Sequence, residues 1–337
     1  MSRYSRQELF AGIGPRGQRA IRRARVALVG CGALGSVLAD TMVRAGVGAL
    51  TLVDRDYLEE SNLHRQSLFD EEDVRRGLPK AAAAEARLRA INAEVDVRGI
   101  VADVGADNAA ELIAGADLVL DGTDNFETRF LVNDVCVRAG VPWVYGACVG
   151  AYGLALLVRP RATPCLRCLL EDMPAPGSGP TCDTAGVIAP IVHVIAGVQG
   201  GEALKVLAGR TESLLPGVVT VDLWQGTFEV MDLRGQQPSC PACTQDRYDY
   251  ADAAAPGTAV LCGRDAVQVR APRGTRVDLP ALAARLAGAG EVTANEHLVR
   301  FRHGANELVV FGDGRAIVKG VSDAAQARSV YARYVGS

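Results

Sequence analysis

Apolar and polar residues alternate along the first half of the chain in blocks that predict strands and helices in turn. Four short apolar runs predict buried strands at residues 25–30, 49–54, 95–101 and 117–121. Helical spacing or composition predicts helices within residues 1–24 and at 33–44, 78–92 and 125–139. Within 33–44, Leu34, Val37 and Leu38 fall on one face. Apolar strands that alternate with helices are typical of an α/β fold with a mostly parallel, doubly wound, Rossmann-like sheet.

The pattern changes after Arg159. Residues 141–150 and 152–160 are two strand-like runs that could pair as a hairpin, and the Pro- and Gly-rich stretch that follows to residue 182 predicts loops. Residues 183–209 predict one long helix, or two helices broken near Gly200 and Gly201. Two further strands are expected at 218–223 and 227–232. We therefore expect a first domain over residues 1–245.

The last part of the chain has a pattern of its own. Residues 246–257 predict a linker, and 258–337 predict a β-α-β-β-β-α unit with a hairpin turn between Gly312 and Gly314. About 80 residues can support a small core. We expect a small α+β C-terminal domain whose role the sequence does not indicate.

Composition and charge exclude some classes of protein. The chain has 337 residues and a net charge of −3, so it presents no basic field for nucleic acid. Its first residues contain no apolar run typical of a secretory signal. Residues 184–201 carry no Asp, Glu, Lys or Arg, but Pro190, His193 and Gln199 favour a helix in the core or a subunit interface over a membrane span. We expect a cytoplasmic protein that binds no membrane.

A glycine-rich turn lies between the first strand and the next helix. Gly30, Gly32 and Gly35 match G-x-G-x-x-G, and Asp54 stands 19 residues after Gly35, where an acid that binds a ribose would lie. The helix N-terminus and the loop amides favour an anion. The pattern predicts a nucleotide site, against the alternative of a tight turn without a ligand. It does not separate NAD from other nucleotides.

The segment after the second strand is unusually rich in polar side chains. Residues 53–69 include Asp56, Asn62, Arg65 and Gln66, and Lys80 follows at the start of the alanine-rich helix. Arg65 and Lys80 could reach one anionic ligand while Asp54 holds its ribose. The alternative is a solvated charged loop.

Two acids follow the fourth strand in the segment DLVLDGTDNFETR. Asp121 and Asp124 would lie at the carboxyl edge of the sheet, where open α/β sheets bind ligands. A carboxylate beside a triphosphate suits Mg²⁺. Either acid could instead cap the next helix.

Nine cysteines, an odd number, argue against a disulfide framework in a chain without an export signal. Cys165 and Cys168 form one C-x-x-C pair, and Cys240 and Cys243 form another, with 71 residues between the two pairs. Four such thiolates predict a structural Zn²⁺ that joins two distant loops. Four unrelated thiols or a [4Fe–4S] cluster are the alternatives.

Cys182 follows a Gly- and Pro-rich stretch and precedes a predicted helix. A helix N-terminus favours the reactive thiolate. An incidental loop cysteine is the other interpretation.

Together these segments resemble the ThiF/HesA/MoeB family of sulfur-carrier adenylyltransferases, bacterial relatives of ubiquitin-activating enzymes. The resemblance covers roughly residues 3–245, through RYSRQ, GCGALGS, LVDRDYLEESNLHRQ, GLPKA, DGTDN, the C-x-x-C pairs and CDTAGVIAP. It implies that Mg²⁺ and ATP are used to adenylate the C-terminal glycine of a small ubiquitin-like sulfur carrier ending in Gly-Gly, with release of pyrophosphate.

The resemblance also implies roles for single residues. Gly30, Gly32 and Gly35 would approach the phosphates and Asp54 the ribose hydroxyls. Asn62, Arg65, Gln66 and Lys80 would hold the phosphates, and Asp124 the Mg²⁺. Arg6 would enter the partner's site across a homodimer. Cys182 would form a covalent link to the carrier or accept sulfur from a donor such as a cysteine desulfurase.

Residues 258–337 resemble the extra domain of some thiamine-pathway adenylyltransferases, which favours a ThiS-like carrier over a MoaD-like one. Three rival functions remain. An NAD oxidoreductase leaves Arg65, Lys80 and the paired cysteines unexplained. A non-catalytic partner-binding member would typically lack Arg65, Lys80 and Asp124. An ATP-dependent tRNA threonylcarbamoyladenosine dehydratase shares the fold, but the cysteine pairs and the absence of a basic field weigh against it.

Overall fold

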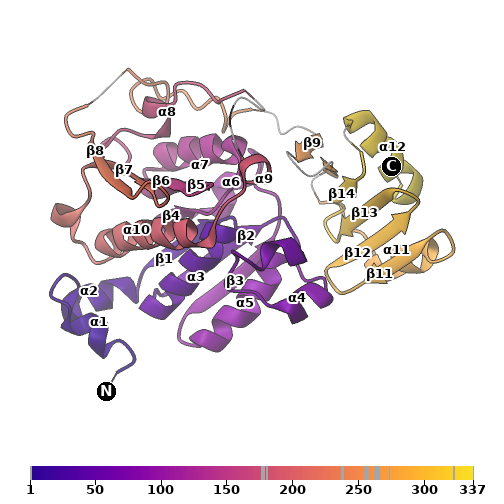
Figure 1. The fold of residues 1–337 in the computed structure, drawn as a ribbon, viewed down its shortest axis with the longest axis horizontal. Coiled ribbons are helices and arrows are strands. Elements are labelled where there is room, and N and C mark those ends of the chain that lie inside the picture. The colour runs from indigo at the N-terminus through magenta and orange to yellow at the C-terminus, as the bar shows by residue number, and fades with distance from the viewer. Residues whose placement is uncertain are drawn as a thin grey trace. The chain divides into compact units, whose positions relative to one another are not determined.

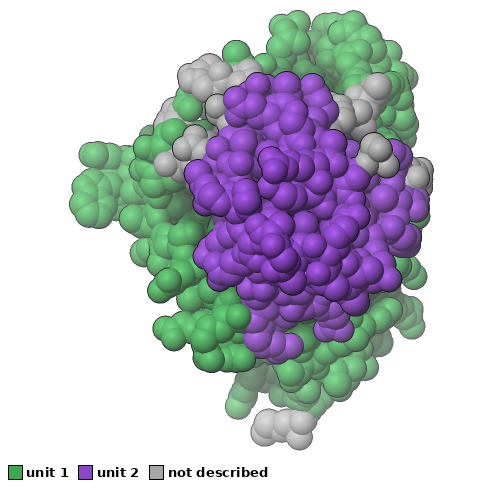
Figure 2. Space-filling view, turned by 90° about the vertical axis from the view of Figure 1, so that its right-hand side faces the viewer, with its two compact units in different colours: residues 1–75, 79–254 green, residues 76–78, 255–337 purple. Residues whose placement is uncertain are grey.

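The computed structural model describes residues 2–175, 179, 181–236, 239–253, 258–261, 266–272, 274–321 and 323–336. Its chain divides into two compact units, residues 1–75 with 79–254, and residues 76–78 with 255–337, coloured separately in Figure 2. The last four positions of the linker expected at 246–257, and Cys262, lie outside the described residues.

The first unit is built on a mixed eight-stranded sheet. Its strand order is β3-β2-β1-β4-β5-β6-β7-β8, with β1 to β5 parallel and the last three pairs antiparallel. The strands are β1 (Arg25–Val29), β2 (Ala49–Asp54), β3 (Asp96–Val101), β4 (Leu118–Asp121), β5 (Trp143–Val149), β6 (Tyr152–Val158), β7 (Gly217–Asp222) and β8 (Thr227–Asp232). The expected α/β sheet is present, but it is mixed, because the hairpin of β5 and β6 turns the chain back.

Helices cover both faces of this sheet (Figure 1). The helices are α1 (Ser5–Leu9), α2 (Gly14–Ile21), α3 (Ala33–Ala45), α4 (Glu71–Arg75), α5 (Lys80–Ile91), α6 (Ala109–Leu112), α7 (Phe126–Ala139), α8 (Leu166–Leu169), α9 (Cys182–Ala185) and α10 (Ala189–Leu207). Two 3-10 turns, Glu60–Asn62 and Thr211–Ser213, complete the unit. Helix α3 packs against both α10 and α5, whereas α7 packs against α6 and α8. Successive strand residues point to opposite faces, so each central strand contributes to both layers.

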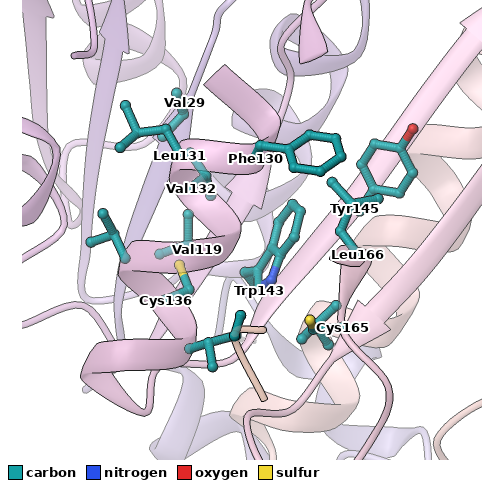
Figure 3. Packing of buried hydrophobic residues seen from close by; sticks show 14 of the residues in the cluster. Val29, Val119, Phe130, Leu131, Val132, Cys136, Trp143, Tyr145, Cys165 and Leu166 are labelled. Atoms are coloured by element: carbon teal, nitrogen blue, oxygen red, sulfur yellow. The ribbon is translucent and has the colours of Figure 1, made fainter. Parts of the chain in front are cut away.

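The core under α7 joins the central strands to a loop beyond β6. Val29 and Val119 from β1 and β4 pack with Phe130 of α7 and Trp143 of β5, and all four are buried (Figure 3). Cys165 belongs to the same cluster and lies beside Trp143 (Figure 3). Burial of large apolar side chains is worth about 1.5–3 kcal/mol each. This packing therefore fixes both the strand ends and the first C-x-x-C loop.

The helix expected at 183–209 is interrupted near its start. The structure has a single turn, α9, and then α10, separated by Gly186 with φ +73°. The suggested break at Gly200 and Gly201 is wrong, because both glycines lie inside α10, where Gly200 is buried against Thr41 of α3. Only glycine adopts positive φ without strain, which explains why the chain turns at Gly186.

The second unit is an antiparallel sheet with two helices packed on it. Its strand order is β11-β12-β13-β14-β10-β9. The elements are β9 (Thr258–Leu261), β10 (Ala266–Val269), α11 (Leu279–Leu286), β11 (Glu291–Ala294), β12 (Leu298–His303), β13 (Asn306–Phe311), β14 (Ala316–Lys319) and α12 (Ala324–Tyr334). The predicted hairpin at Gly312–Gly314 joins β13 to β14, but the expected single first strand is the pair β9 and β10, and β11 was missed. None of the helices in the described part of the chain combines the length and the apolar character needed to cross a bilayer.

Candidate active site

The glycine turn brings β1, β4 and α3 into backbone contact. Gly30 adopts φ +86°, and a Cβ there would lie 2.7 Å from the backbone of Gly122. A Cβ on Gly35 would lie 2.0 Å from the carbonyl oxygen of Gly30, and one on Gly122 would lie 2.5 Å from the same oxygen. Side chains are sterically excluded at all three positions. Gly122, which follows β4, is a site glycine that the fingerprint alone did not identify.

Gly32 differs from these three glycines. A Cβ there would meet nothing nearer than the side-chain nitrogen of Gln66 at 3.8 Å. Gly32 is the N-cap residue of α3, and packing within the protein does not require a glycine there.

Asp54 ties the end of β2 to the glycine turn. Its carboxylate accepts hydrogen bonds from the backbone N–H of Cys31 at 2.6 Å and of Asp56 at 2.7 Å. Burial raises the pKa of Asp54, and the charge of nearby Lys80 opposes that rise. The structure thus places the acid beside the glycine turn, as its spacing predicted.

Lys80 is buried and held in place by an acid. It begins α5, its side chain is 4 % exposed, and its Nζ lies 3.2 Å from Oδ2 of Asp56. The backbone N–H of Lys80 also donates to the carbonyl of Asp56. A buried cation needs such a partner. Asp56, two residues after Asp54, therefore also belongs to the candidate site.

Asn62 and Gln66 lie in the turn after β2, and both are buried. Asn62 accepts a hydrogen bond from the N–H of Glu59, and Glu59 in turn caps the 3-10 turn. The side-chain oxygen Oε1 of Gln66 is buried and has no hydrogen-bond partner within the described structure, and its Nε2 faces Gly32. A buried carbonyl of this kind is costly unless a ligand or water satisfies it.

Arg65 is half-buried and its Nη1 contacts the carbonyl of Ser61 and the ring of His64, at 2.8 Å each. The turn of Asn62, Arg65 and Gln66 follows β2, so it stands at the carboxyl edge of the parallel strands with the glycine turn.

The two acids after β4 have different surroundings. Asp121 is fully buried, accepts from the N–H and hydroxyl of Thr123, and pairs with Arg129 at 3.5 Å. Burial raises the pKa of Asp121, which the charge of Arg129 opposes. Asp124 is exposed. Neither acid caps α7, because Asn125 does so through a 2.9 Å bond from the N–H of Thr128.

Arg129 and Gln199 brace the loop that carries Asp124. Arg129 donates to the carbonyl of Thr123 at 2.7 Å, and Gln199 of α10 donates to the carbonyls of Asp121 and Val144. Sequence reasoning missed both residues. The only sequence signal was a polar residue within an apolar helix, which indicates a buried hydrogen bond without naming its partner.

Four cysteines form a compact cluster near the other end of β5. The Sγ atoms of Cys165, Cys168, Cys240 and Cys243 all lie within 4.8 Å of one another. Three separations are 3.7, 3.8 and 3.9 Å. Thiolates around one tetrahedral metal at a bond length of about 2.3 Å would be about 3.8 Å apart. The spacing suits a single ion, whereas a four-iron cluster would bind each thiolate through a different iron and spread the sulfurs apart.

Protein contacts also join the two cysteine loops. Arg167, between the first two cysteines, is buried and pairs with Asp134 of α7 at 3.5 Å and Asp249 at 2.9 Å. Leu166 donates its N–H to Asn133. Cys165, one of the four, packs in the same core cluster as Trp143 (Figure 3). Trp143 is at the amino end of β5, so the cysteines stand at the edge of the sheet opposite to the glycine turn.

Cys182 lies at the carboxyl edge of the sheet, the same edge as the glycine turn and the Asp124 loop. It opens the four-residue α9, which Thr181 caps, and its Sγ donates to the carbonyl of Cys148 in β5 at 3.1 Å. The expected long helix behind Cys182 is absent, so the argument from a helix dipole is weaker than the sequence suggested.

Arg6 lies far from the glycine turn of its own chain. It is exposed on α1, and the neighbouring Gln7 binds the carbonyl of Ala45 at the end of α3. The glycine turn is at the other end of α3, which has 13 residues and is about 20 Å long. Within one protomer, the structure does not bring Arg6 to the site.

The strand order and the glycine turn are those of a doubly wound α/β protein, a class that binds nucleotides at this edge of the sheet. The glycine turn, Asp54 and the Asp124 loop meet where the order reverses between β1 and β4, the crevice in which doubly wound sheets bind nucleotides. The profile of the ThiF family matches residues 4–242, and the chain belongs to this family.

The chain is similar to two named relatives and to one solved structure. It is 49% identical over 337 residues to the sulfur carrier protein ThiS adenylyltransferase of Bacillus subtilis, covering 99% of both chains. It is 40% identical to the sulfur carrier protein adenylyltransferase of Thermus thermophilus, over 72% of this chain and 90% of that one. A crystal structure of E. coli MccB with ATP superimposes with a TM-score of 0.62 at 25% identity, over 72% of this chain and 74% of that one.

Proposed function

We propose that this protein is a nucleotidyltransferase that uses ATP to adenylate the C-terminal glycine of a small ubiquitin-like sulfur-carrier protein. The observation that carries the proposal is the meeting of the glycine turn, Asp54, Lys80 and Asp124 at one edge of the sheet. The Bacillus relative, named for this activity, is similar over the whole chain and supports it.

In this proposal the nucleotide lies along the glycine turn. Gly30, Gly32 and Gly35 let the backbone approach the phosphates, and the N-terminus of α3 faces them. Asp54 takes the ribose hydroxyls while the N–H of Cys31 fixes its orientation. MccB, similar in fold, was crystallised with ATP, which supports a nucleotide as the ligand.

Four side chains hold the phosphates in this arrangement. They are Asn62, Arg65, Gln66 and Lys80. The buried acceptor of Gln66 and the buried cation of Lys80 fit a polar ligand rather than an apolar one. Asp56 pairs with Lys80 at 3.2 Å, which helps to fix the position of the cation.

The Mg²⁺ that accompanies ATP would be held by Asp124. Mg²⁺ keeps several waters and takes one or two protein carboxylates together with phosphate oxygens. Asp124 is exposed at the sheet edge, where solvent and a ligand can reach it, whereas Asp121 is fully buried beside Thr123 and Arg129. The ion would neutralise charge on the phosphates.

The reaction places a carrier carboxylate against the α-phosphorus. The carboxylate oxygen forms a bond to that phosphorus, the bond to the β-phosphate oxygen breaks, and pyrophosphate leaves with the electron pair. Arg65 and Lys80 stabilise the charge that moves to the leaving group. Alignment of a flexible carrier tail can supply about 7–11 kcal/mol. The proposed carrier ends in Gly-Gly, whose lack of side chains leaves its carboxylate sterically unobstructed.

The carrier is proposed to be ThiS-like, which places the product in thiamine biosynthesis. The support is that the Bacillus relative named for ThiS is similar through residues 258–337 as well. A MoaD-like carrier, with a role in molybdopterin synthesis, is the second candidate, because the Thermus relative is named for a sulfur carrier without further specification.

The four clustered cysteines are proposed to bind structural Zn²⁺. Their sulfur spacing fits one tetrahedral ion, and their place at the opposite edge of the sheet separates them from the reaction. A closed site with four thiolates leaves no position for substrate. The ion would join the Cys165 loop to the Cys240 loop.

A homodimer is proposed to complete the site. Arg6 is about 20 Å from the glycine turn of its own chain, judged by the length of α3, so it could act only in a partner's site. An arginine supplied in this way can contribute on the order of 10³–10⁵ in rate.

Cys182 is proposed to receive the carrier or sulfur after adenylation. It lies at the same edge as the Asp124 loop, which supports this role. The sulfur would come from a donor such as a cysteine desulfurase.

The central experiment is ATP–pyrophosphate exchange with carriers that do and do not end in Gly-Gly. Exchange that requires ATP, Mg²⁺ and an intact Gly-Gly tail is expected. Absence of exchange with ThiS-like and MoaD-like carriers would contradict the proposal. The dehydratase alternative predicts ATP use that depends on modified tRNA, and a non-catalytic member predicts no exchange at all.

A further inference from the structure

Two cysteines meet at the carboxyl edge of the large sheet. Cys182 donates its thiol to the carbonyl oxygen of Cys148 at 3.1 Å. A carbonyl oxygen lies about 2.4 Å from its own Cα, so the Cys182 sulfur is within about 5.5 Å of the Cα of Cys148. A cysteine sulfur lies about 2.8 Å from its own Cα, so the two Cα atoms are at most about 8 Å apart. Disulfides span Cα–Cα distances of about 4.4–6.8 Å, so closure needs rotation of both side chains and a shift of α9 toward β5.

The backbone holds the two residues in this arrangement. The chain after α9 returns to the end of β5, where Gly150 donates to the carbonyl of Gly186 at 2.8 Å and receives a bond from Ile188 at 3.0 Å. A bridge pairs Gly150 with Val187. The contact of Cys182 with Cys148 therefore belongs to a fixed junction and not to a chance approach of side chains.

The two thiols differ in access. Cys148 is 9% exposed, and its Sγ points to the carbonyl of Ile191 at 3.8 Å. Burial, reinforced by the nearby Cys182, raises the pKa of Cys148 to about 12. Cys182 is half-buried. A reagent from solution therefore meets the more exposed Cys182 first.

We propose that Cys148 is a resolving thiol for Cys182, so that the pair closes into a reversible disulfide when a low-molecular-weight disulfide attacks the site. This inference rests on the proposed function, in which Cys182 handles the carrier or its sulfur. Closure would withdraw Cys182 from sulfur transfer until a reductant reopens the bond.

The exchange balances in two steps. The Cys182 thiolate attacks one sulfur of the small disulfide, whose S–S bond breaks and releases one thiolate. Cys148 then attacks Sγ of Cys182 as its proton passes to the departing sulfur, the mixed S–S bond breaks, and the second half of the small disulfide leaves as a thiol. The two protein thiols lose two electrons, and the small disulfide becomes two thiols.

The other described cysteines are less suited to this chemistry. Cys165, Cys168, Cys240 and Cys243 belong to the proposed metal cluster, while Cys31 and Cys136 are fully buried. Burial raises the pKa of Cys136, which lies within α7 and offers a matched control.

The test treats the full-length, zinc-loaded protein with glutathione disulfide, alkylates remaining thiols, and maps peptides without reduction. We expect a peptide that links Cys148 to Cys182 and disappears on reduction. Cys148→Ser should instead accumulate one glutathionyl group on Cys182, and Cys182→Ser should show neither product. Cys136→Ala should behave as wild type.

A stable glutathionyl adduct on wild-type Cys182, or a cross-link to any other cysteine, would overturn the proposal. The peptide map of the wild-type protein tests the proposal even if a variant folds poorly. Exchange of pyrophosphate into ATP by reduced Cys148→Ser should equal that of wild type. Exchange that fails in every sample would contradict the proposed function, while the disulfide map would still decide on the thiol pair.

Discussion

The backbone N–H of Cys31 donates to the carboxylate of Asp54 at 2.6 Å, which joins the glycine turn to the end of β2. In the proposed function this carboxylate therefore has two tasks, because it shapes the turn and would bind the ribose hydroxyls. Asp54→Asn retains an oxygen that can accept from Cys31, whereas Asp54→Ala retains none. We expect the asparagine variant to raise KM for ATP and the alanine variant also to lower the melting temperature, measured by calorimetry and exchange kinetics. Equal ATP affinity in Asp54→Asn and wild type would contradict the ribose role.

Asp124 should be essential for exchange and dispensable for folding. It is exposed, and Asn125 caps α7 in its place. Loss of a metal-holding carboxylate removes several kcal/mol of charge stabilisation, which is at least about 10²-fold in rate. Asp124→Ala should lose exchange by that factor while its melting temperature stays unchanged. Glu127→Gln, which alters an exposed acid one turn along, is the matched control and should retain exchange.

The cysteine cluster should behave as a structural metal site. Cys240→Ser removes one of four ligands, so zinc content measured by mass spectrometry of the metal should fall and the urea midpoint should drop. Exchange per folded molecule should change little, because the cluster lies at the sheet edge away from the glycine turn. Cys136→Ala removes a buried thiol outside the cluster and should keep its zinc. A full equivalent of zinc in Cys240→Ser would refute the ligand assignment.

Sites shared across a dimer predict complementation. Arg6→Ala and Asp124→Ala should each be inactive alone. After the two proteins are unfolded together and refolded in equal amounts, half the dimers are mixed and each contains one intact site, which restores about a quarter of wild-type exchange. The control mixes the two folded variants without unfolding them, so that their subunits do not exchange. No recovery, with mixed dimers confirmed by native mass spectrometry, would argue that Arg6 does not act in trans.

Glu307 should make the stability of the C-terminal unit depend on acid. Burial favours its neutral form, but a 2.7 Å bond from Arg302 and the charges of Arg300 and Lys319 outweigh burial and lower the pKa of Glu307 to about 2. Because this pKa lies below the unfolded value of 4.5, the stabilisation is complete above that pH and is lost as pH falls toward 2.

At neutral pH, Glu307→Gln should therefore cost about 1–2 kcal/mol after allowance for solvent screening. The measurement is hydrogen exchange of the β12 to β14 amides across pH. The difference from wild type should shrink below pH 4.5. Glu296→Gln, at a carboxylate that is 79% exposed, should show no such effect, and a constant difference at all pH values would contradict the assignment.

The sequence by itself determined the local chemistry of the site. Gly30 and Gly35 could be recognised because a strand, a tight turn and a helix leave no room for a Cβ. The spacing of the C-x-x-C pairs predicted a four-thiol cluster, and the structure gathers those sulfurs within 4.8 Å. Both are short-range signals, carried by residue type and by separation along the chain.

Tertiary structure decided which distant residues act together. Only the fold shows that Asp56 holds Lys80, that Arg129 and Gln199 brace the Asp124 loop, and that Asp121 is already engaged. Only the fold separates Arg6 from the glycine turn by the length of α3 and brings Cys148 to Cys182. These relationships depend on how strands pair and helices pack across long stretches of chain, and residue spacing carries no record of those contacts.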